Sequence, residues 1–191
     1  MPSNSLSRWN RERAAALDEI ENAHLRVGGT ERGRRYATQQ INFAYVTLLS
    51  SQFQGYCRDL HSESIDYVVA VLPTHLQGLL RREFLFSRNL ERGNPHPGAI
   101  GSDFMRLGID IWAEVYAFGG RNQRRRVLLE DMIRWRNAIA HQDFGQVAPA
   151  GTPVIHLSRV RAWRRAIGAL AEAFDRAMRR YLSALIGTAP W

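Results

Sequence analysis

The longest uninterrupted helical pattern in the chain runs from Glu31 to Leu72 and constrains the fold class more than any other feature. This stretch contains no proline, and glycine interrupts it only at Gly33 and Gly55. Its apolar residues recur at the spacing of an amphipathic helix: Tyr36, Ile41, Phe43, Tyr45, Val46, Leu48, Leu49 and Phe53. The pattern predicts one long helix, or two helices joined near residues 55–62.

Start and stop signals divide the rest of the chain into further helices. Serine and asparagine caps ahead of Trp9 and a glycine pair at 28–29 predict a first helix over residues 5–27. Prolines, polar caps and a second glycine pair predict later helices over residues 73–85, 102–118, 121–141 and 158–185. The segments 94–98 and 143–158 are rich in proline and glycine and predict loops, the second with room for one short extended piece.

The length and composition fit one globular domain. The chain has 191 residues, and its apolar (45%) and charged (23%) fractions are those of ordinary folded proteins. We therefore expect an all-α, up-down bundle of about five to six helices, with residues 1–191 as a single domain. Cys57 is the only cysteine, which excludes an intrachain disulfide and favours a reducing, cytoplasmic location. No signal peptide or membrane-spanning run is recognisable, so no contact with a membrane is expected.

The chain is strongly basic, with a net charge of +8. A field of this sign favours a polyanionic partner such as RNA, DNA or an acidic membrane surface. All 26 basic residues are arginine, whose planar guanidinium group recognises phosphate in a bidentate manner. Charge alone does not identify a binding site, because the codon bias of a GC-rich genome and solvated helix faces also explain many arginines.

The helix expected over residues 121–141 carries the side chains that are the strongest candidates for a catalytic or binding role. Its core-facing stripe follows helical spacing: Leu128, Met132, Trp135 and Ile139. Asn137 and His141 lie off this stripe and share a face, whereas Arg136 and His141 are about 140° apart around an ideal helix. Arg136 and His141 would meet at one phosphate group only if the helix loosens near Gln142, or if a second protomer supplies part of the site.

The segment Arg136-Asn137-Ala138-Ile139-Ala140-His141 resembles the signature of HEPN domains, in which an arginine, often followed by asparagine, precedes a histidine by a short spacer. The flanking Trp135 and Gln142 look like the RiboL-PSP branch of that family, and residues 43–69 look like its long second helix. The resemblance covers residues 35–185.

The resemblance implies an architecture and an activity. HEPN domains are helical bundles that commonly form homodimers, in which arginine and histidine of both protomers line one cleft, and many are metal-independent endoribonucleases without a cofactor. The implied reaction is attack of a ribose 2′-hydroxyl on the adjacent phosphate, which requires RNA. His141 would be the general base or acid, Arg136 would neutralise charge on the phosphoryl oxygens, and Asn137 would orient the histidine or a phosphate oxygen. The family setting is toxin–antitoxin pairs or anti-phage defence, with an antitoxin protein as a further partner.

Two arginine clusters could contact the RNA. The first opens the helix that carries the motif, where cations oppose the helix macrodipole and so favour a functional purpose or a nearby acid: Arg121, Arg124, Arg125 and Arg126. The second, with weaker grounds, is on the closing helix: Arg161, Arg164 and Arg165. The alternative for both is a solvated helix face.

Other interpretations of the motif stay open. The cleft could bind RNA, a nucleotide or a protein without catalysis. The motif could also be structural, with Arg136 paired to Asp131 or Asp143 and His141 placed near the last carbonyl groups of the helix. The six histidines lack the spacing of a zinc site, and Cys57 is more typical of a small core residue than of a nucleophile.

Overall fold

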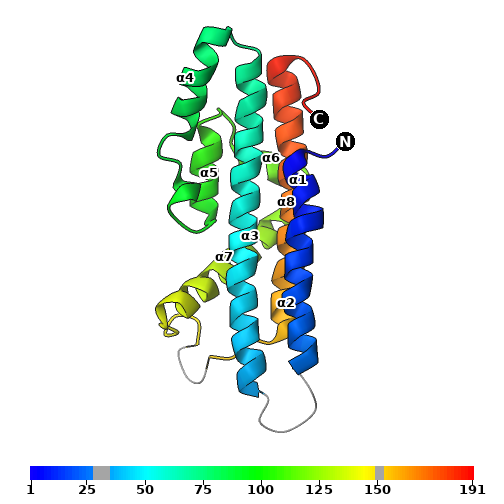
Figure 1. The fold of residues 1–191 in the computed structure, drawn as a ribbon, viewed down its shortest axis with the longest axis vertical. Coiled ribbons are helices and arrows are strands. Elements are labelled where there is room, and N and C mark those ends of the chain that lie inside the picture. The colour runs from blue at the N-terminus through cyan, green and yellow to red at the C-terminus, as the bar shows by residue number, and fades with distance from the viewer. Residues whose placement is uncertain (28–34, 149–152) are drawn as a thin grey trace.

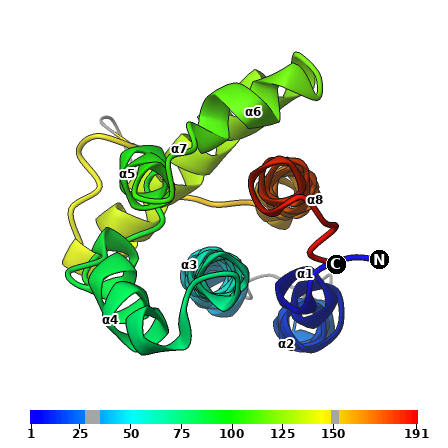
Figure 2. The same cartoon turned by 90° about the horizontal axis from the view of Figure 1, so that it is seen from above.

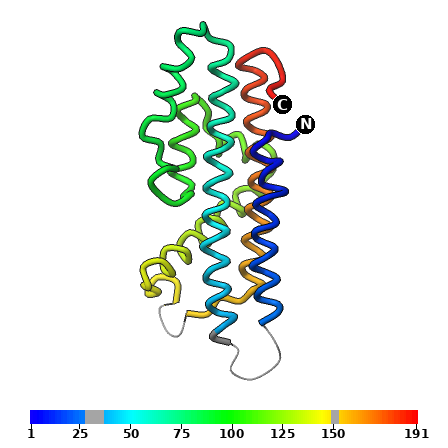
Figure 3. Tube along the Cα trace, in the orientation of Figure 1, coloured from blue at the N-terminus to red at the C-terminus, as the bar shows by residue number. Residues whose placement is uncertain are grey.

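The computed structural model describes residues 1–27, 35–148 and 153–191, and every regular element within these ranges is helical (Figure 1). The prediction of an all-α fold is confirmed. In chain order the elements are α1 (Asn4–Arg8), the π-helical turn η1 (Trp9–Arg13), α2 (Ala14–Val27), α3 (Arg35–Ala70), α4 (Thr74–Leu85), the 3-10 turn η2 (Asn89–Glu91), α5 (Pro97–Met105), α6 (Ile111–Ala117), α7 (Arg121–His141) and α8 (Leu157–Ile186). Because η1 joins α1 to α2 without a break, the described part contains seven helical rods rather than five to six (Figure 3).

Three long rods form the frame of the molecule. The first rod, α1 to α2, runs antiparallel to α3, and α8 runs parallel to α3 (Figure 1). The three rods form a triangle when the molecule is viewed from above (Figure 2). Seen from above, α4 lies outside α3, while α5, α6 and α7 cover the side between α3 and α8 (Figure 2). Among the described residues, no helix has both the length and the apolar character needed to cross a membrane.

α3 continues unbroken through Gly55, although glycine weakens helices, because the contacts of Arg13 need a residue without a side chain at this position. A Cβ atom at Gly55 would lie 2.5 Å from Nη1 of Arg13, which crosses α3 at this point. The two Nη atoms of Arg13 donate to Gln52 at 2.8 Å and to Asp59 at 2.7 Å. The glycine therefore gives room to an arginine that ties the first rod to α3, and α3 is one helix.

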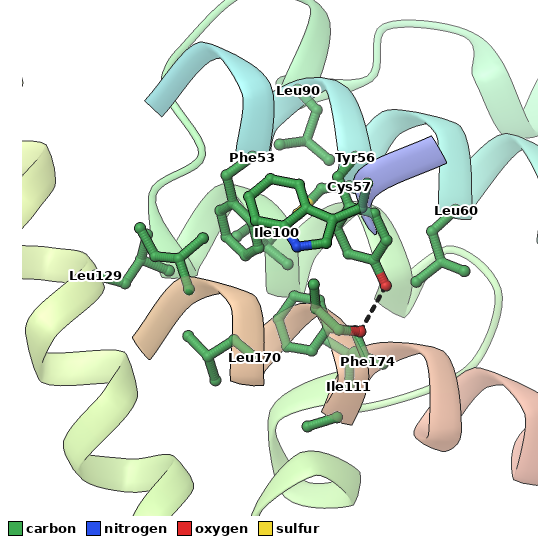
Figure 4. Close-up of a cluster of buried hydrophobic side chains, with 14 of the residues drawn as sticks. Phe53, Tyr56, Cys57, Leu60, Leu90, Ile100, Ile111, Leu129, Leu170 and Phe174 are labelled. Carbon is green, nitrogen blue, oxygen red and sulfur yellow. Dashed lines mark hydrogen bonds between the residues drawn. The ribbon is translucent and has the colours of Figure 1, made fainter. Parts of the chain in front are cut away.

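The core lies where the first rod, α3 and α8 meet. The ring of Trp9 lies 6.0 Å from Phe53 and 5.7 Å from Tyr56, and Phe53 lies 6.1 Å from Phe174 of α8. The buried Tyr56 hydroxyl donates to the carbonyl oxygen of Ala171 at 2.7 Å (Figure 4). Large aromatic side chains from three elements thus form one continuous apolar cluster.

The prediction of one helix over residues 102–118 is wrong, because the chain turns in its middle. Gly108 has a φ of 83°, a left-handed conformation that glycine adopts without strain. Asp110 then caps α6, since its carboxylate accepts hydrogen bonds at 3.1 Å from the backbone N–H groups two and three residues later. The first of the two helices begins earlier than predicted, with Pro97 in its first turn.

The segment 143–158 forms no strand in its described parts, 143–148 and 153–156. Side chains of α3 hold its second half instead. The Asn42 amide donates to the carbonyl oxygen of Ile155 at 2.7 Å, and Gln39 accepts from the Ile155 N–H group at 3.2 Å. The extended piece is therefore paired with side chains rather than with another strand.

A buried polar cluster fixes the chain between α4 and α5. The carboxylate of Asp103 accepts hydrogen bonds from the N–H groups of Asn89 at 2.9 Å and Leu90 at 2.8 Å. His61 of α3 donates from Nε2 to the carbonyl oxygen of Asp103 at 2.9 Å, which leaves Nδ1 to accept from Arg88 at 3.3 Å. These bonds suit a neutral imidazole, and burial together with the charge of Arg88 lowers the pKa of His61 to about 4.

Phe174→Ala should lower the free energy of unfolding by about 3–5 kcal/mol, because it leaves a cavity at the centre of the aromatic cluster. Urea unfolding measures the change. Phe86→Ala is the matched control: its side chain is 65% exposed, so its effect should stay within about 0.5 kcal/mol. Equal effects of the two substitutions would contradict the placement of Phe174.

The buried His61 should make the fold less stable in mild acid. Its pKa is about 4 in the folded state against an ordinary value of 6.5, so the unfolded chain binds the proton first as the pH falls. Stability from this group is complete above pH 6.5 and is lost between pH 6.5 and about 4.

Urea unfolding at about pH 7.5 and about pH 5 should show a loss of roughly 2 kcal/mol from His61. His61→Gln retains a donor and an acceptor but does not titrate, so its pH dependence should be smaller by that amount. The same pH dependence in both proteins would show that His61 is not the titrating group.

Candidate functional site

α7 presents the motif from a firmly packed helix. Met132 and Trp135 are buried, and Leu128 and Ile139 are partly buried against the core, which confirms the predicted core-facing stripe. Off this stripe, α7 carries Asn137, which is half-buried, and His141, which is exposed.

A carboxylate clamp fixes α7 against α8. Nη2 of Arg159 lies 3.1 Å and 2.9 Å from the two carboxylate oxygens of Asp131, and the Trp163 indole donates to the same carboxylate at 3.0 Å. The Arg159 guanidinium also lies over the rings of Trp135 (5.3 Å) and Trp163 (5.1 Å). Arg134 adds a hydrogen bond at 3.3 Å. Both carboxylate oxygens of Asp131 therefore accept hydrogen bonds from neighbouring side chains.

The helix stays α-helical through His141 and ends directly after it. Gln142 has a φ of 54°, a left-handed conformation, and the N–H group of Asp143 closes the helix on the carbonyl oxygen of Ala138 at 3.1 Å. No loosening brings Arg136 towards His141, so the two remain about 140° apart around the helix axis. One chain therefore does not direct both side chains at one phosphate group.

Asn94 is a site residue that the sequence analysis missed. Its amide donates to the side-chain oxygen of Asn137, and the same oxygen accepts from Nη1 of Arg136 at 3.3 Å. Both bonds go to the oxygen of the Asn137 amide, so its two N–H donors, which have no acceptor among the described residues, stay available for another group. The sequence predicted a loop over residues 94–98, of which Pro97 and Gly98 instead begin α5. The proximity of Asn94 to α7 follows only from the packing of α5.

Arg136 has no ion pair within the described residues. Its two predicted structural partners are otherwise engaged: Asp131 binds Arg159, and the side chain of Asp143 accepts from the N–H group of Gly145 at 3.2 Å. The interpretation in which Arg136 pairs with either carboxylate is therefore wrong. The position of His141 at the last helical residue agrees with both the structural and the catalytic interpretation.

A shallow groove of about 630 Å³ borders the motif between α2, α3 and α7. The described residues that line it are all uncharged: Ile20, Gln40, Phe43, Ala44, Thr47, Leu48, Ser51, Ile139 and Gln142. Such a surface suits the side of another helix better than it suits a phosphate group.

Two arginines of the cluster at the start of α7 are bound to neighbouring side chains. Arg125 donates to Asn122 at 2.7 Å. Arg126 donates to the Tyr116 hydroxyl at 2.9 Å and to Glu130 at 3.1 Å. These contacts support the turn between α6 and α7, so the two arginines have structural partners.

Arg121 and Arg124 are exposed and have no ion pair in the part of the chain that the structure describes. They lie at the opposite end of α7 from His141, at a distance of roughly 25–30 Å given the rise of an α-helix. The cluster and the motif therefore do not form one compact site.

Most of the second arginine cluster is neutralised. Arg161 pairs with Glu21 at 2.7 Å, and Arg164 pairs with Asp18 at 2.7 Å, so both connect α8 to α2. Arg165 is exposed. This cluster mainly stabilises the bundle.

Cys57 is completely buried beside the aromatic core, and burial raises the pKa of its thiol well above the ordinary value. A buried thiol of this kind is chemically inert. In the described ranges, no group of histidine, cysteine, aspartate and glutamate side chains is arranged to hold a metal ion.

Comparison with protein-family models, with curated protein sequences and with solved structures gave no match for the chain. Any functional assignment therefore depends on the motif and on its surroundings in the fold.

A double-mutant cycle should detect the contact between Asn94 and Asn137. Each alanine substitution should lower the free energy of unfolding by about 0.5–1.5 kcal/mol, because the shared hydrogen bond is lost. The double variant should cost clearly less than the sum of the two, since the second substitution removes a bond that is already broken. Strictly additive effects, measured by urea unfolding, would show that the two side chains do not interact.

Proposed function

We propose that the chain is a HEPN-type endoribonuclease that acts as a homodimer and cleaves RNA without a metal ion. The observation that carries the proposal is the state of Arg136, which is half-buried beside the fixed amide of Asn137 and has no carboxylate partner in the described residues. A half-buried guanidinium group that is left without an acidic partner supports a role in binding phosphate.

In the proposed reaction, His141 takes the proton from a ribose 2′-hydroxyl while the 2′-oxygen attacks the adjacent phosphorus. The bond from phosphorus to the 5′-oxygen breaks, and the leaving oxygen takes up a proton from water or from the protonated His141, which gives a 5′-hydroxyl and a 2′,3′-cyclic phosphate. Arg136 stabilises the negative charge that grows on the phosphoryl oxygens. The N–H donors of Asn137 orient a phosphate oxygen.

The helix geometry supports a site shared between two protomers. Because Arg136 and His141 diverge by about 140° on an unbroken helix, an arginine from one protomer and a histidine from the other would have to face one phosphate. The uncharged groove beside Ile139 and Gln142 offers a surface for the second protomer. A role in a toxin–antitoxin pair or in anti-phage defence, with an antitoxin as partner, rests on the family resemblance alone, and a cytoplasmic location rests on the single cysteine.

Cleavage of labelled RNA in the presence of EDTA tests the activity. His141→Ala and Arg136→Ala should each lower the rate by about a hundredfold or more, and the wild-type products should end in cyclic phosphate. His75→Ala and Arg82→Ala, at exposed positions of α4, should cleave at the wild-type rate. If dimeric wild-type protein does not cleave but binds RNA or a nucleotide, a non-catalytic binding module replaces the enzyme proposal.

Mixing the two inactive variants tests the shared site. If each site combines an arginine and a histidine from different protomers, half of the dimers carry one intact site, and roughly a quarter of the wild-type rate should return. Subunit exchange is checked with differently tagged chains. Full exchange without any recovery of activity would place both residues of a site in one protomer.

A further inference from the structure

Two arginines of α8 are held on one aromatic ring at the turn between α6 and α7. The guanidinium carbon of Arg180 lies 4.8 Å and that of Arg176 lies 5.6 Å from the centre of the Phe118 ring. The two arginines are one helical turn apart and share a face of α8, while Phe118 ends α6 and is 37% exposed. The ring restricts both guanidinium groups, so they lose less freedom when they bind an anion.

The positive charge at this ring is not balanced. Arg180 pairs with Glu114, but Arg176 has no ion pair in the described ranges. Glu172, one turn before Arg176, is exposed and forms no ion pair with it. The exposed Arg179 beside them also lacks an acidic partner within the described part of the chain.

The start of α7 adds two more arginines. Arg121 follows Phe118 by three residues, and Arg124 lies one turn further along α7; both are exposed and unpaired among the described residues. We use the name basic face for the residues at this turn, at the start of α7 and on the part of α8 that contacts the Phe118 ring: Phe118, Arg121, Arg124, Arg176, Arg179 and Arg180. Figure 2 shows the turn between α6 and α7 at the outer edge of the molecule, where an extended ligand can reach it.

We propose that the basic face binds the phosphate backbone of single-stranded RNA. Several guanidinium groups spread over two helices match a chain of phosphates better than a single small anion, and an exposed aromatic ring is typical of surfaces that bind unpaired strands. Because the contacts are to phosphate, the binding has little base specificity. The choice of RNA as the polyanion rests on the proposed function, whereas the affinity for phosphates does not.

Fluorescence anisotropy with a labelled single-stranded 2′-O-methyl RNA tests the proposal. This probe lacks the 2′-hydroxyl nucleophile, so binding is measured without cleavage. The variant R121Q/R124Q/R176Q should raise Kd about tenfold or more and reduce the dependence of log Kd on log salt by about two. The control R11Q/R26Q/R82Q removes the same charge from exposed arginines that form no ion pair in the described ranges, and should change Kd less than about threefold.

Phe118→Leu should weaken binding by roughly threefold, because the guanidinium groups lose the ring that restricts them.

Equal losses in the two triple variants would overturn the proposal, because they would show that binding depends on net charge alone. Absence of wild-type binding would also overturn it, as would binding to vesicles with anionic lipid that RNA does not compete for. If cleavage depends on His141 while the probe binds all variants equally, the basic face is wrong and the ribonuclease proposal stands. If the probe binds through the basic face but the protein does not cleave RNA, the basic face stands and the ribonuclease proposal is wrong.

Discussion

The packing of α8 against α3 through large aromatic side chains is the contact on which the rest of the structure depends. Phe174 of α8 touches Phe53 of α3 and also lies 5.1 Å from Trp112 of α6, so one side chain connects three helices. The first rod adds Trp9 to the same cluster. Because these rings are fully or almost fully buried, α3 and α8 form a rigid pair, and the shorter helices take their positions from it.

The elements that carry the candidate site attach to this pair through buried or half-buried polar groups. The Asp131 clamp connects α7 to α8, and the cluster of His61, Arg88 and Asp103 holds the chain that leads to Asn94. Each charged group in these contacts has several hydrogen bonds, which offset the cost of removing it from water. The orientation of the Asn137 amide therefore depends on contacts that begin far from the motif.

The sequence predicted the elements whose signals are local. The bounds of α7 follow from a glycine pair and a polar end, and the inward stripe of Met132 and Trp135 follows from spacing alone. The turn at Gly108 was missed because a single glycine in an apolar helical pattern does not show that the chain reverses. The contact of Asn94 with Asn137 joins residues far apart in the chain, so no local pattern could reveal it. Charge could not separate the arginines either, since Arg161 and Arg124 look alike in sequence. Within the described part of the chain, Arg161 pairs with Glu21, whereas Arg124 has no acidic partner.

The arginines with and without acidic partners lie in different parts of the molecule, and this distribution indicates what kind of ligand could contact both ends of α7. Arginines that face acidic side chains, such as Arg13 and Arg161, connect helices. Several arginines that have no acidic partner among the described residues lie at the two ends of α7 and on the adjoining part of α8. The Asp131 clamp and the buried stripe hold α7 straight, so the basic face and His141 stay roughly 30 Å apart. A ligand that meets both must be long and negatively charged along its length. A nucleic acid strand has that form, and a nucleotide or a single phosphate does not.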